Sequence, residues 1–421
     1  MPVQLTPRDR DMLEGREGPA VAMAMRIVVR MADVEGAREL LDITHAHIDS
    51  TIYIGDATLE FAERLASLGA KVAVPATLNV SGVDEHHWQE WAVPPDWAAK
   101  AYRQMVAYQS MGTEPTWTCA PYQAAARPAF GQQIAWGESN AIAFANSVLA
   151  ARTERYPDLL DICCAITGRA PATGLHLAEN RAGEVLLTLE GIPVDVQHDD
   201  LFYPVLGALM GQFAEDEVPV IDGIQVRPTE DQLKAVCAAG ATTGRVALFH
   251  IVGVTPEAPT LEAAFQGRVP RRQVAITMPM LVETRRKLST ARGDALDLVV
   301  LGSPHFSIDE FRQLAPLLSG RERHPAVQFL VTTSRLVRDL AGKAGLLSPL
   351  EAFGGRLTVD TCILATPMLP ANVRTLMTNS AKFAYYSPGL LGAAVAFGSL
   401  RDCVESAVAG RIVVDESRWT T

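Results

Sequence analysis

LDLVVLG at residues 296–302 and VQFLVTT at residues 327–333, with the helical pattern of Ile308–Leu318 between them, decide the fold class of this chain. Both runs are largely apolar and partly β-branched, which is typical of strands that are covered on both faces. A helical segment between two such strands favours a parallel crossover. The stretch therefore predicts a parallel sheet with helices on its faces.

The same alternation extends outward along the chain. Further apolar runs are VALFHIV (246–252), VAITMP (274–279), LTVDTCILA (357–365) and RTLMT (374–378), and helical patterns lie at Thr260–Phe265, Val282–Leu288 and Ser334–Ala344. In the N-terminal part we expect strands at His45–Ile54 and Lys71–Val74, and helices after Thr6 and at Asp56–Leu68, Pro95–Met111, Glu138–Ala151 and Tyr156–Thr167.

These patterns predict an α/β fold with parallel sheets flanked by helices, in two lobes around a cleft. The small-residue, turn-rich stretch AAGATTGR marks a boundary near Gly240–Arg245. We expect an N-terminal α/β lobe over residues 1–240, with a helical start, and a C-terminal α/β lobe with a parallel sheet over residues 241–421. A second, weaker boundary falls near Asn180–Gly183.

Composition and charge exclude several classes of protein. Of the 421 residues, 48% are hydrophobic and 20% charged, as in ordinary globular proteins. A formal net charge of −11 without a long basic block argues against nucleic acid and anionic membranes as partners. The longest uncharged apolar stretch, Tyr385–Leu400, is too short and too rich in Gly for a membrane span. With no apolar signal segment at the N-terminus, we expect a cytoplasmic protein whose six cysteines are thiols or ligands.

The residues that follow the apolar runs are the first candidates for a site. In open parallel sheets, ligands bind beyond the carboxyl ends of the strands. Those positions hold small, polar or thiol residues, namely Gly302-Ser303-Pro304-His305, Thr332-Thr333-Ser334, Cys362 and Asn379-Ser380. They either line a ligand site or are plain turn residues.

Two cysteines stand out as candidate metal ligands. Cys119 lies in TWTCAPY and Cys362 in TVDTCIL, so only the fold could bring them together. No Cys-x-x-Cys occurs, which argues against a zinc ribbon or a thioredoxin motif. The chain also lacks a His-Glu-x-x-His zinc motif, a Gly-x-Ser-x-Gly elbow and a Walker loop. A single histidine such as His47, in HAHIDS, is more often structural than catalytic.

The segment AWGESNAIAFANSVLAARTER, residues 135–155, carries unusual polar residues on an otherwise apolar helix. At 3.6 residues per turn, Glu138, Ser139 and Asn146 project to roughly the same side. Buried polar groups need partners, so these residues either satisfy one another between helices or dock a polar ligand. We favour an anionic ligand near the helix N-terminus, where the dipole stabilises negative charge.

Several of these motifs together resemble the aconitase X family, over nearly the whole chain. They are TWTCAPY, IAWGESNAIAFANSVLAARTER, ITGRAPATGLHLAENR, VLGSPHFS, VDTCILA and TNSAKFAYYSP. The resemblance implies an aconitase-like fold and a dehydratase, acting either on cis-3-hydroxy-L-proline, as in bacteria, or on mevalonate 5-phosphate, as in archaea. It also implies an iron–sulfur cluster and a small swivelling domain, fused or separate.

The resemblance places Cys119 and Cys362 at cluster-ligand positions. Where the archaeal pattern has Gly-Cys-Pro-His, this chain has Ser303 in Gly-Ser-Pro-His. Either Cys403 completes the ligand shell, or the cluster is smaller, or the Ser303 hydroxyl is a ligand, although serine is a poor substitute for a thiolate. We expect a 2Fe-2S cluster, and the departure favours the bacterial, hydroxyproline-type activity.

The implied reaction is elimination of water from a small hydroxy acid, in which a base removes the proton beside the carboxylate and the metal acts as a Lewis acid. We expect Glu138, Ser139 and Asn140 to bind substrate or tune the metal, Lys382 to neutralise the carboxylate, and His47 to be a reserve acid or base. The other residues expected to bind substrate are Asn79, Asn146, Thr332, Thr333, Ser334 and Ser380.

The family's small domain carries a Gly-Ser-rich loop that nothing in this chain resembles, so we expect a separate small-subunit partner. One alternative is a phosphomevalonate dehydratase, for which Arg152 and Arg335 are the available phosphate-binding residues. Another is a non-catalytic regulatory homologue, which the absent small domain and Ser303 would allow.

Overall fold

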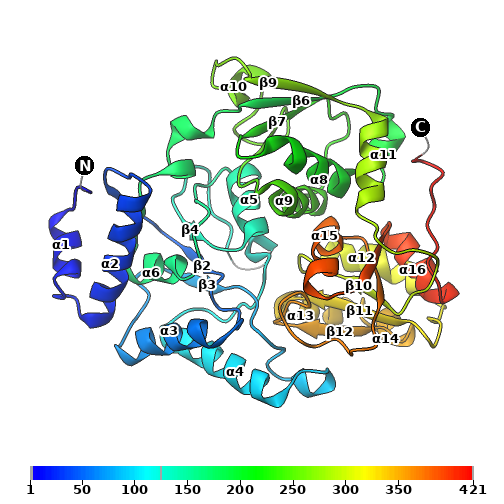
Figure 1. Ribbon diagram of the computed structural model, residues 1–421, viewed down its shortest axis with the longest axis horizontal. Helices are drawn as coiled ribbons and strands as arrows, with labels where there is room; N and C mark the ends of the chain where they lie inside the picture. The colour runs from blue at the N-terminus through cyan, green and yellow to red at the C-terminus, as the bar shows by residue number, and fades with distance from the viewer. Residues whose placement is uncertain (1–2, 124–125, 420–421) are drawn as a thin grey trace.

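The computed structural model describes residues 3–123 and 126–419 as an assembly of three parallel sheets with helices packed around them (Figure 1). The first sheet has the strand order β3-β2-β4, with β2 at Ala46–Ile48, β3 at Ala76–Leu78 and β4 at Ala135–Trp136. A separate antiparallel pair joins β1 (Leu40–Asp42) to β5 (Arg169–Pro171). The expected α/β fold with parallel sheets flanked by helices is confirmed.

The largest sheet is the one that LDLVVLG and VQFLVTT predict. Its order is β12-β11-β10-β13-β14, all parallel, with β10 at Leu298–Leu301, β11 at Gln328–Thr333, β12 at Arg356–Val359, β13 at Thr375–Thr378 and β14 at Ala394–Phe397. Along β10, Leu298 and Val300 pack into one hydrophobic cluster, and Val299 and Leu301 into another on the opposite face. Both faces are therefore covered, which is why the run reads as continuously apolar.

The third sheet shows that the expected boundary at residue 240 is not a boundary between sheets. Its order is β8-β7-β6-β9, with β6 at Val185–Leu189, β7 at Pro219–Asp222, β8 at His250–Ile251 and β9 at Arg272–Ile276. Two of these strands precede residue 240 and two follow it. The runs at 246–252 and 274–279 therefore belong to this sheet, because β8 pairs with β7 and β9 pairs with β6.

The helices cover the sheets and connect them. They are α1 (Pro7–Leu13), α2 (Pro19–Val34), α3 (Asp56–Ser67), α4 (Pro95–Ser110), α5 (Ser139–Ser147), α6 (Leu160–Thr167), α7 (Val194–Gln197), α8 (Phe202–Ala214), α9 (Glu230–Gly244), α10 (Leu261–Ala264), α11 (Met278–Lys287), α12 (Ile308–Leu318), α13 (Arg335–Lys343), α14 (Ser348–Ala352), α15 (Ala381–Leu390) and α16 (Leu400–Ala409). Helix α1 begins after Thr6, as expected, and Thr6 forms a capping box with Asp9. Helix α9 packs against α5, α8 and α15, so it ties the three sheets together.

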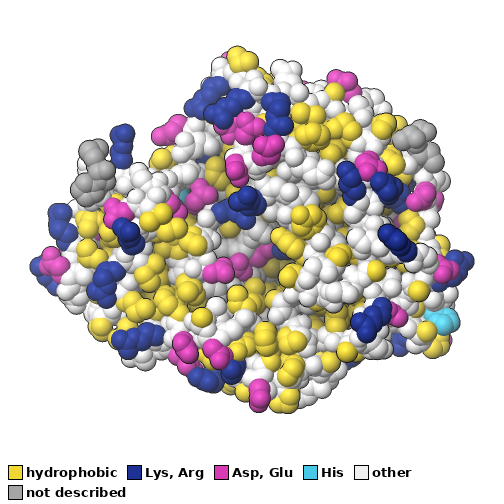
Figure 2. Space-filling model, in the orientation of Figure 1, with side chains coloured by type: hydrophobic (Ala, Val, Ile, Leu, Met, Phe, Trp, Pro, Cys, Tyr) yellow, Lys and Arg dark blue, Asp and Glu magenta, His cyan; other side chains and the backbone are white. Residues whose placement is uncertain are grey.

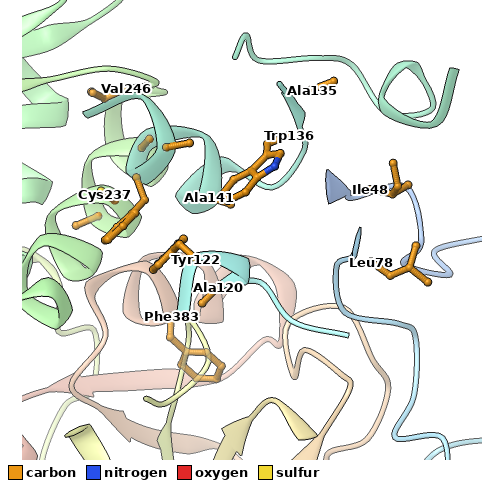
Figure 3. Close-up of a cluster of buried hydrophobic side chains, with 14 of the residues drawn as sticks. Ile48, Leu78, Ala120, Tyr122, Ala135, Trp136, Ala141, Cys237, Val246 and Phe383 are labelled. Carbon is orange, nitrogen blue, oxygen red and sulfur yellow. The ribbon is translucent and has the colours of Figure 1, made fainter. Parts of the chain in front are cut away.

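One hydrophobic core runs through all three sheets. Figure 3 shows part of it, where Ile48, Leu78 and Ala135 come from the three strands of the first sheet. Ala141 of α5, Cys237 of α9 and Phe383 of α15 belong to the same cluster. Because the core is continuous, the carboxyl ends of the first and the largest sheet are held at fixed positions.

The expected strand at Lys71–Val74 is wrong, and the strand is Ala76–Leu78 instead. The backbone N–H groups of residues 72 and 73 donate to Met111 O and Ala165 O and not to a neighbouring strand. Within the described residues, no helix is both long enough and apolar enough to cross a membrane.

Candidate active site

A cavity of about 260 Å³ lies where the carboxyl ends of the first and the largest sheet face each other. Asp49 follows β2, Asn79 follows β3 and Glu138 follows β4, and all three line this cavity. From the largest sheet come Ser303 after β10, Thr332 at the end of β11 and Cys362 after β12. Figure 2 shows acidic side chains gathered near the middle of this face, where the surface is hollowed. The arrangement follows the rule that ligands bind at the carboxyl ends of parallel strands.

Two glycines let backbone segments approach closely at this edge. A Cβ atom at Gly137, between β4 and α5, would lie 2.5 Å from Asp49 Cβ. A Cβ atom at Gly302, which has φ +96°, would lie 2.1 Å from Thr332 O. Any larger residue would push the two strand ends apart.

Glu138 and Lys382 form a buried ion pair across the cavity. Glu138 caps α5 with φ 66°, and its Oε2 accepts the Ala141 N–H at 2.9 Å. Its Oε1 lies 2.5 Å from Lys382 Nζ, and both side chains are largely buried. Burial would lower the pKa of Lys382, but the charges of Glu138 and Cys119 outweigh it and raise that pKa. Lys382 is therefore a fixed positive charge in the cavity.

Cys119 and Cys362 line the same cavity, as their expected role requires. The His305 backbone N–H donates to Cys119 Sγ at 3.2 Å. Burial and the nearby Glu138 carboxylate raise the pKa of Cys119 to about 12, and burial raises that of Cys362, while Lys382 opposes both shifts. A metal would have to displace the thiol protons.

The donor set can be compared with what an iron–sulfur cluster needs. Across residues 3–123 and 126–419, no three His, Cys, Asp or Glu side chains come together as a metal site. The cavity does bring together two thiols, the Ser303 hydroxyl, a backbone N–H aimed at a sulfur and a neighbouring ammonium. Thiolates with N–H donors are suited to a cluster, so the residues present fit one whose remaining ligand is Ser303 or comes from outside this chain.

Other residues with expected roles lie in or beside the cavity. Asn79, Ser139 and Thr332 line it with Glu138 and Lys382. Ser380 caps α15 by accepting the Phe383 N–H at 3.1 Å, and its hydroxyl donates to Ser303 O. It lines an adjoining space of about 120 Å³ that also contacts Ser303 and Lys382.

Four expected residues are buried behind the cavity and have structural partners. His47 Nδ1 lies 2.8 Å from Thr77 Oγ1, and burial lowers the pKa of His47 to about 3, so the expected reserve acid or base is a neutral core histidine. Asn140 Nδ2 donates to Tyr122 Oη at 2.9 Å. The Thr333 hydroxyl donates to Phe306 O at 2.6 Å, and Ser334 caps α13.

The positions of Asn146 and Cys403 correct two further expectations. Asn146 lies at the far end of α5, where it bonds Thr153, Ala247 O and Arg181, all at 3.0–3.1 Å. It therefore joins helix to loop and has no free group for a ligand. Cys403, on α16, is buried in the apolar cluster on the outer face of the largest sheet and does not line the cavity.

Asp49 is an acidic cavity residue that the sequence did not predict. Its backbone N–H donates to Asp161 Oδ2 at 2.6 Å, and its carboxylate accepts a hydrogen bond from Asn79. Burial, with the charges of Glu138 and Asp161, raises the pKa of Asp49 to about 7. Its position directly after a strand could have indicated a site residue. The predicted strand runs to Ile54, however, so Asp49 falls inside it.

Together the fold and the cavity define an α/β enzyme that acts on a small polar molecule between two parallel sheets. Models of the first, second and third aconitase X domains match residues 2–179, 183–286 and 296–409. The chain is 50% identical to cis-3-hydroxy-L-proline dehydratase of Pseudomonas aeruginosa, over 98% of this chain and 71% of the relative. It is 46% identical to the enzyme of that name from Hypocrea jecorina, over 97% and 69%.

A more distant relative is the phosphomevalonate dehydratase large subunit of Methanothermobacter thermautotrophicus, 36% identical over 93% of this chain and 95% of that one. The crystal structure of Thermococcus kodakaraensis aconitase X in its holo-form superposes with a TM-score of 0.86 and 31% identity, covering 96% of this chain and all of that one. The chain belongs to the aconitase X family. It is an enzyme of the dehydratase, or hydro-lyase, class.

Proposed function

We propose that this enzyme dehydrates cis-3-hydroxy-L-proline. The C2–H and C3–O bonds break, a C2=C3 double bond forms, and water leaves. The resulting enamine tautomerises to the cyclic imine pyrroline-2-carboxylate. The observation that carries the proposal is the identity of 50% and 46%, over nearly the whole chain, to two enzymes of that name, against 36% to the phosphomevalonate relative described above.

The charge of the cavity supports the smaller, unphosphorylated substrate. Among the described residues that line it, Lys382 is the one side chain with a full positive charge, because burial lowers the pKa of His305 to about 4. Arg335 pairs with Glu85 and Asp360, and Arg152 donates to His176 O, so the two arginines considered for a phosphate lie elsewhere. A phosphate normally requires several cationic or N–H donors.

Lys382 binds the substrate carboxylate in this proposal. Glu138 holds the ammonium at 2.5 Å and is itself fixed by the Ala141 N–H. Helix α5 begins at Ser139, so the positive end of its dipole lies in the same region. The chain thus orients the substrate, while Glu138 is a positioning residue for Lys382, and each of its two oxygens already accepts a hydrogen bond.

We further propose that Cys119 and Cys362 hold an iron–sulfur cluster, of the 2Fe-2S type, with Ser303 as the candidate third ligand in this chain. When bound, the iron would supply Lewis-acid stabilisation of the negative charge that develops as the hydroxyl departs. The supporting observations are the shared cavity, the His305 N–H directed at Cys119 and the proximity of Lys382.

A small swivelling-domain partner with a Gly-Ser-rich loop completes the proposal. The two dehydratase relatives extend beyond the matched region, and the archaeal relative is named a large subunit. The partner would supply the base, because the residues described above leave none free at the cavity except Asp49. We place the enzyme in the cytoplasm, in keeping with six free thiols.

The test is to co-express the chain with the neighbouring small-subunit reading frame under anaerobic conditions and to assay both substrates. We expect pyrroline-2-carboxylate from cis-3-hydroxy-L-proline and no turnover of mevalonate 5-phosphate. The opposite preference would refute the proposed substrate. Iron-free protein without either activity would favour a regulatory homologue.

A further inference from the structure

Asn79 leaves one polar atom without a partner inside the cavity. Its side chain is 1% exposed, and its Nδ2 donates to Asp49. Its Oδ1 is buried and has no hydrogen-bond partner among residues 3–123 and 126–419. Burying a carbonyl oxygen without a donor is costly, so this atom calls for an N–H or O–H group from a ligand.

Within the part of the chain that the structure describes, Asp49 forms no ion pair with a Lys, Arg or His side chain. The charged groups that act on it most strongly come from three elements and are all acidic: Glu138 before α5, Asp161 on α6 and Asp158 in the preceding loop. The one ammonium of the cavity, that of Lys382, is already bound to Glu138. Asp161 is satisfied by Ser50 and by backbone N–H groups, so it offers Asp49 no proton.

We propose that Asp49 and Asn79 recognise the ring ammonium of the substrate. The inference rests on the proposed function and extends it. The nitrogen of a proline zwitterion carries two N–H bonds, which match the two acceptors, the Asp49 carboxylate and Asn79 Oδ1. These acceptors follow adjacent strands, because β2 pairs with β3 and the Asn79 N–H donates to Ile48 O at 3.0 Å.

This placement orients the substrate by its two opposite charges. The carboxylate lies against Lys382 and the ammonium against Asp49, so the ring is fixed between the first sheet and α15. Mevalonate 5-phosphate has no cationic group, and its phosphate would place additional negative charge near Asp49 and its acidic neighbours. Asp49 therefore discriminates between the two substrates, because it attracts the ammonium of hydroxyproline and repels the phosphate of mevalonate 5-phosphate.

The pairing also makes binding depend on pH. Asp49 must be ionised to pair with the ammonium, and its pKa is raised to about 7 by burial and by Glu138 and Asp161. Affinity for an ammonium ligand should fall as pH drops through that pKa, because the neutral carboxyl attracts the cation less. Lys382 keeps its charge over this range, so the carboxylate contact does not change.

The experiment uses two ligands that do not react, L-proline and cyclopentanecarboxylate, which share the ring and carboxylate and differ in the nitrogen. Binding of each is measured by calorimetry on the iron-loaded enzyme as purified. The wild type should prefer L-proline, and Asp49→Asn should weaken L-proline binding by ~10–100-fold while leaving the cyclopentane ligand unchanged or tighter. Asn79→Ala should act in the same direction, and the exposed Asp33→Asn should change neither.

Iron content and circular dichroism are recorded for each variant. The inference is overturned if the wild type shows no preference for L-proline, or if both cavity variants keep the wild-type ratio of affinities. Loss of both ligands in equal proportion would also overturn it. Failure of the proposed function is read separately, as a wild-type enzyme that does not dehydrate cis-3-hydroxy-L-proline.

Discussion

At the scale of single residues, the two cavity thiols make a direct prediction. Cys119→Ser and Cys362→Ser should each abolish the visible absorbance of the cluster and lower turnover below detection, because each removes one of the two thiolates proposed to hold the cluster. Anaerobic iron and sulfide analysis checks this. Full iron with full activity in either variant would remove that cysteine from the ligand set.

Cys403 provides the matched control for the thiol variants. It is buried in the apolar cluster of α16 and the largest sheet, away from the cavity. Cys403→Ala should keep the iron and the absorbance, at a cost of about 1 kcal/mol in the free energy of unfolding for the small void left behind. Loss of iron in this variant would reinstate the expectation that Cys403 completes the ligand shell.

Lys382 carries the second prediction at this scale. Lys382→Met should lower kcat/KM by ~10–100-fold, because it removes the charge that we propose binds the substrate carboxylate. Iron content should not change, since Lys382 is not a ligand. Steady-state kinetics with the exposed Lys343→Met as control measures the effect, and an unchanged kcat/KM would exclude Lys382 from substrate binding.

At the scale of elements, the glycine between β4 and α5 decides how closely two strand ends meet. Gly137→Ala should lower the free energy of unfolding by about 1–3 kcal/mol, because the added Cβ lies 2.5 Å from Asp49 Cβ. The same displacement should weaken binding of L-proline. Chemical denaturation measures the free energy of unfolding of Gly137→Ala and of the control Gly389→Ala in α15. At Gly389 an added Cβ meets nothing within 4 Å and improves helix propensity. Equal stability of the two variants would contradict the close approach.

Elements also explain what could be predicted from the sequence. The carboxyl-end rule found Ser303 and Thr332, because β10 and β11 are buried apolar runs with visible ends. It also led to Cys362, although β12 ends at Val359, earlier than the apolar run suggests. It missed Asp49, because β2 spans only Ala46–Ile48 and its end cannot be located from the pattern. Helix periodicity grouped Asn146 with Glu138, but the partners of Asn146 include Ala247 O, about which the local sequence carries no information.

At the scale of the whole molecule, long-range strand pairing set the limits of prediction. The boundary at residue 240 followed a change in composition, yet β6 and β7 pair with β9 and β8 across it. The weaker expected boundary, at Asn180–Gly183, coincides with the boundary between two family domains. The match to the first aconitase X domain ends there and the match to the second begins. Amino-acid composition indicates where turns lie. Which of these turns separate structural units is known only from the pairing of strands within the sheets.

The two thiols belong to different units of the molecule, and this leads to the last prediction. Cys119 lies in the first domain and Cys362 in the third, so a cluster held by both links the units across the cavity. A group that binds the folded state alone adds its binding free energy to stability. Removing iron with a chelator should therefore lower Tm by several degrees.

Calorimetric scans of the wild type before and after chelation measure this shift. Cys119→Ser provides the control, since it should have the lower Tm from the start and show no change with chelator. The shift should also be lost at acid pH, because cluster binding requires both thiols to be deprotonated and protons compete with iron. An equal shift in wild type and Cys119→Ser would mean that the iron sits elsewhere and does not join the two units.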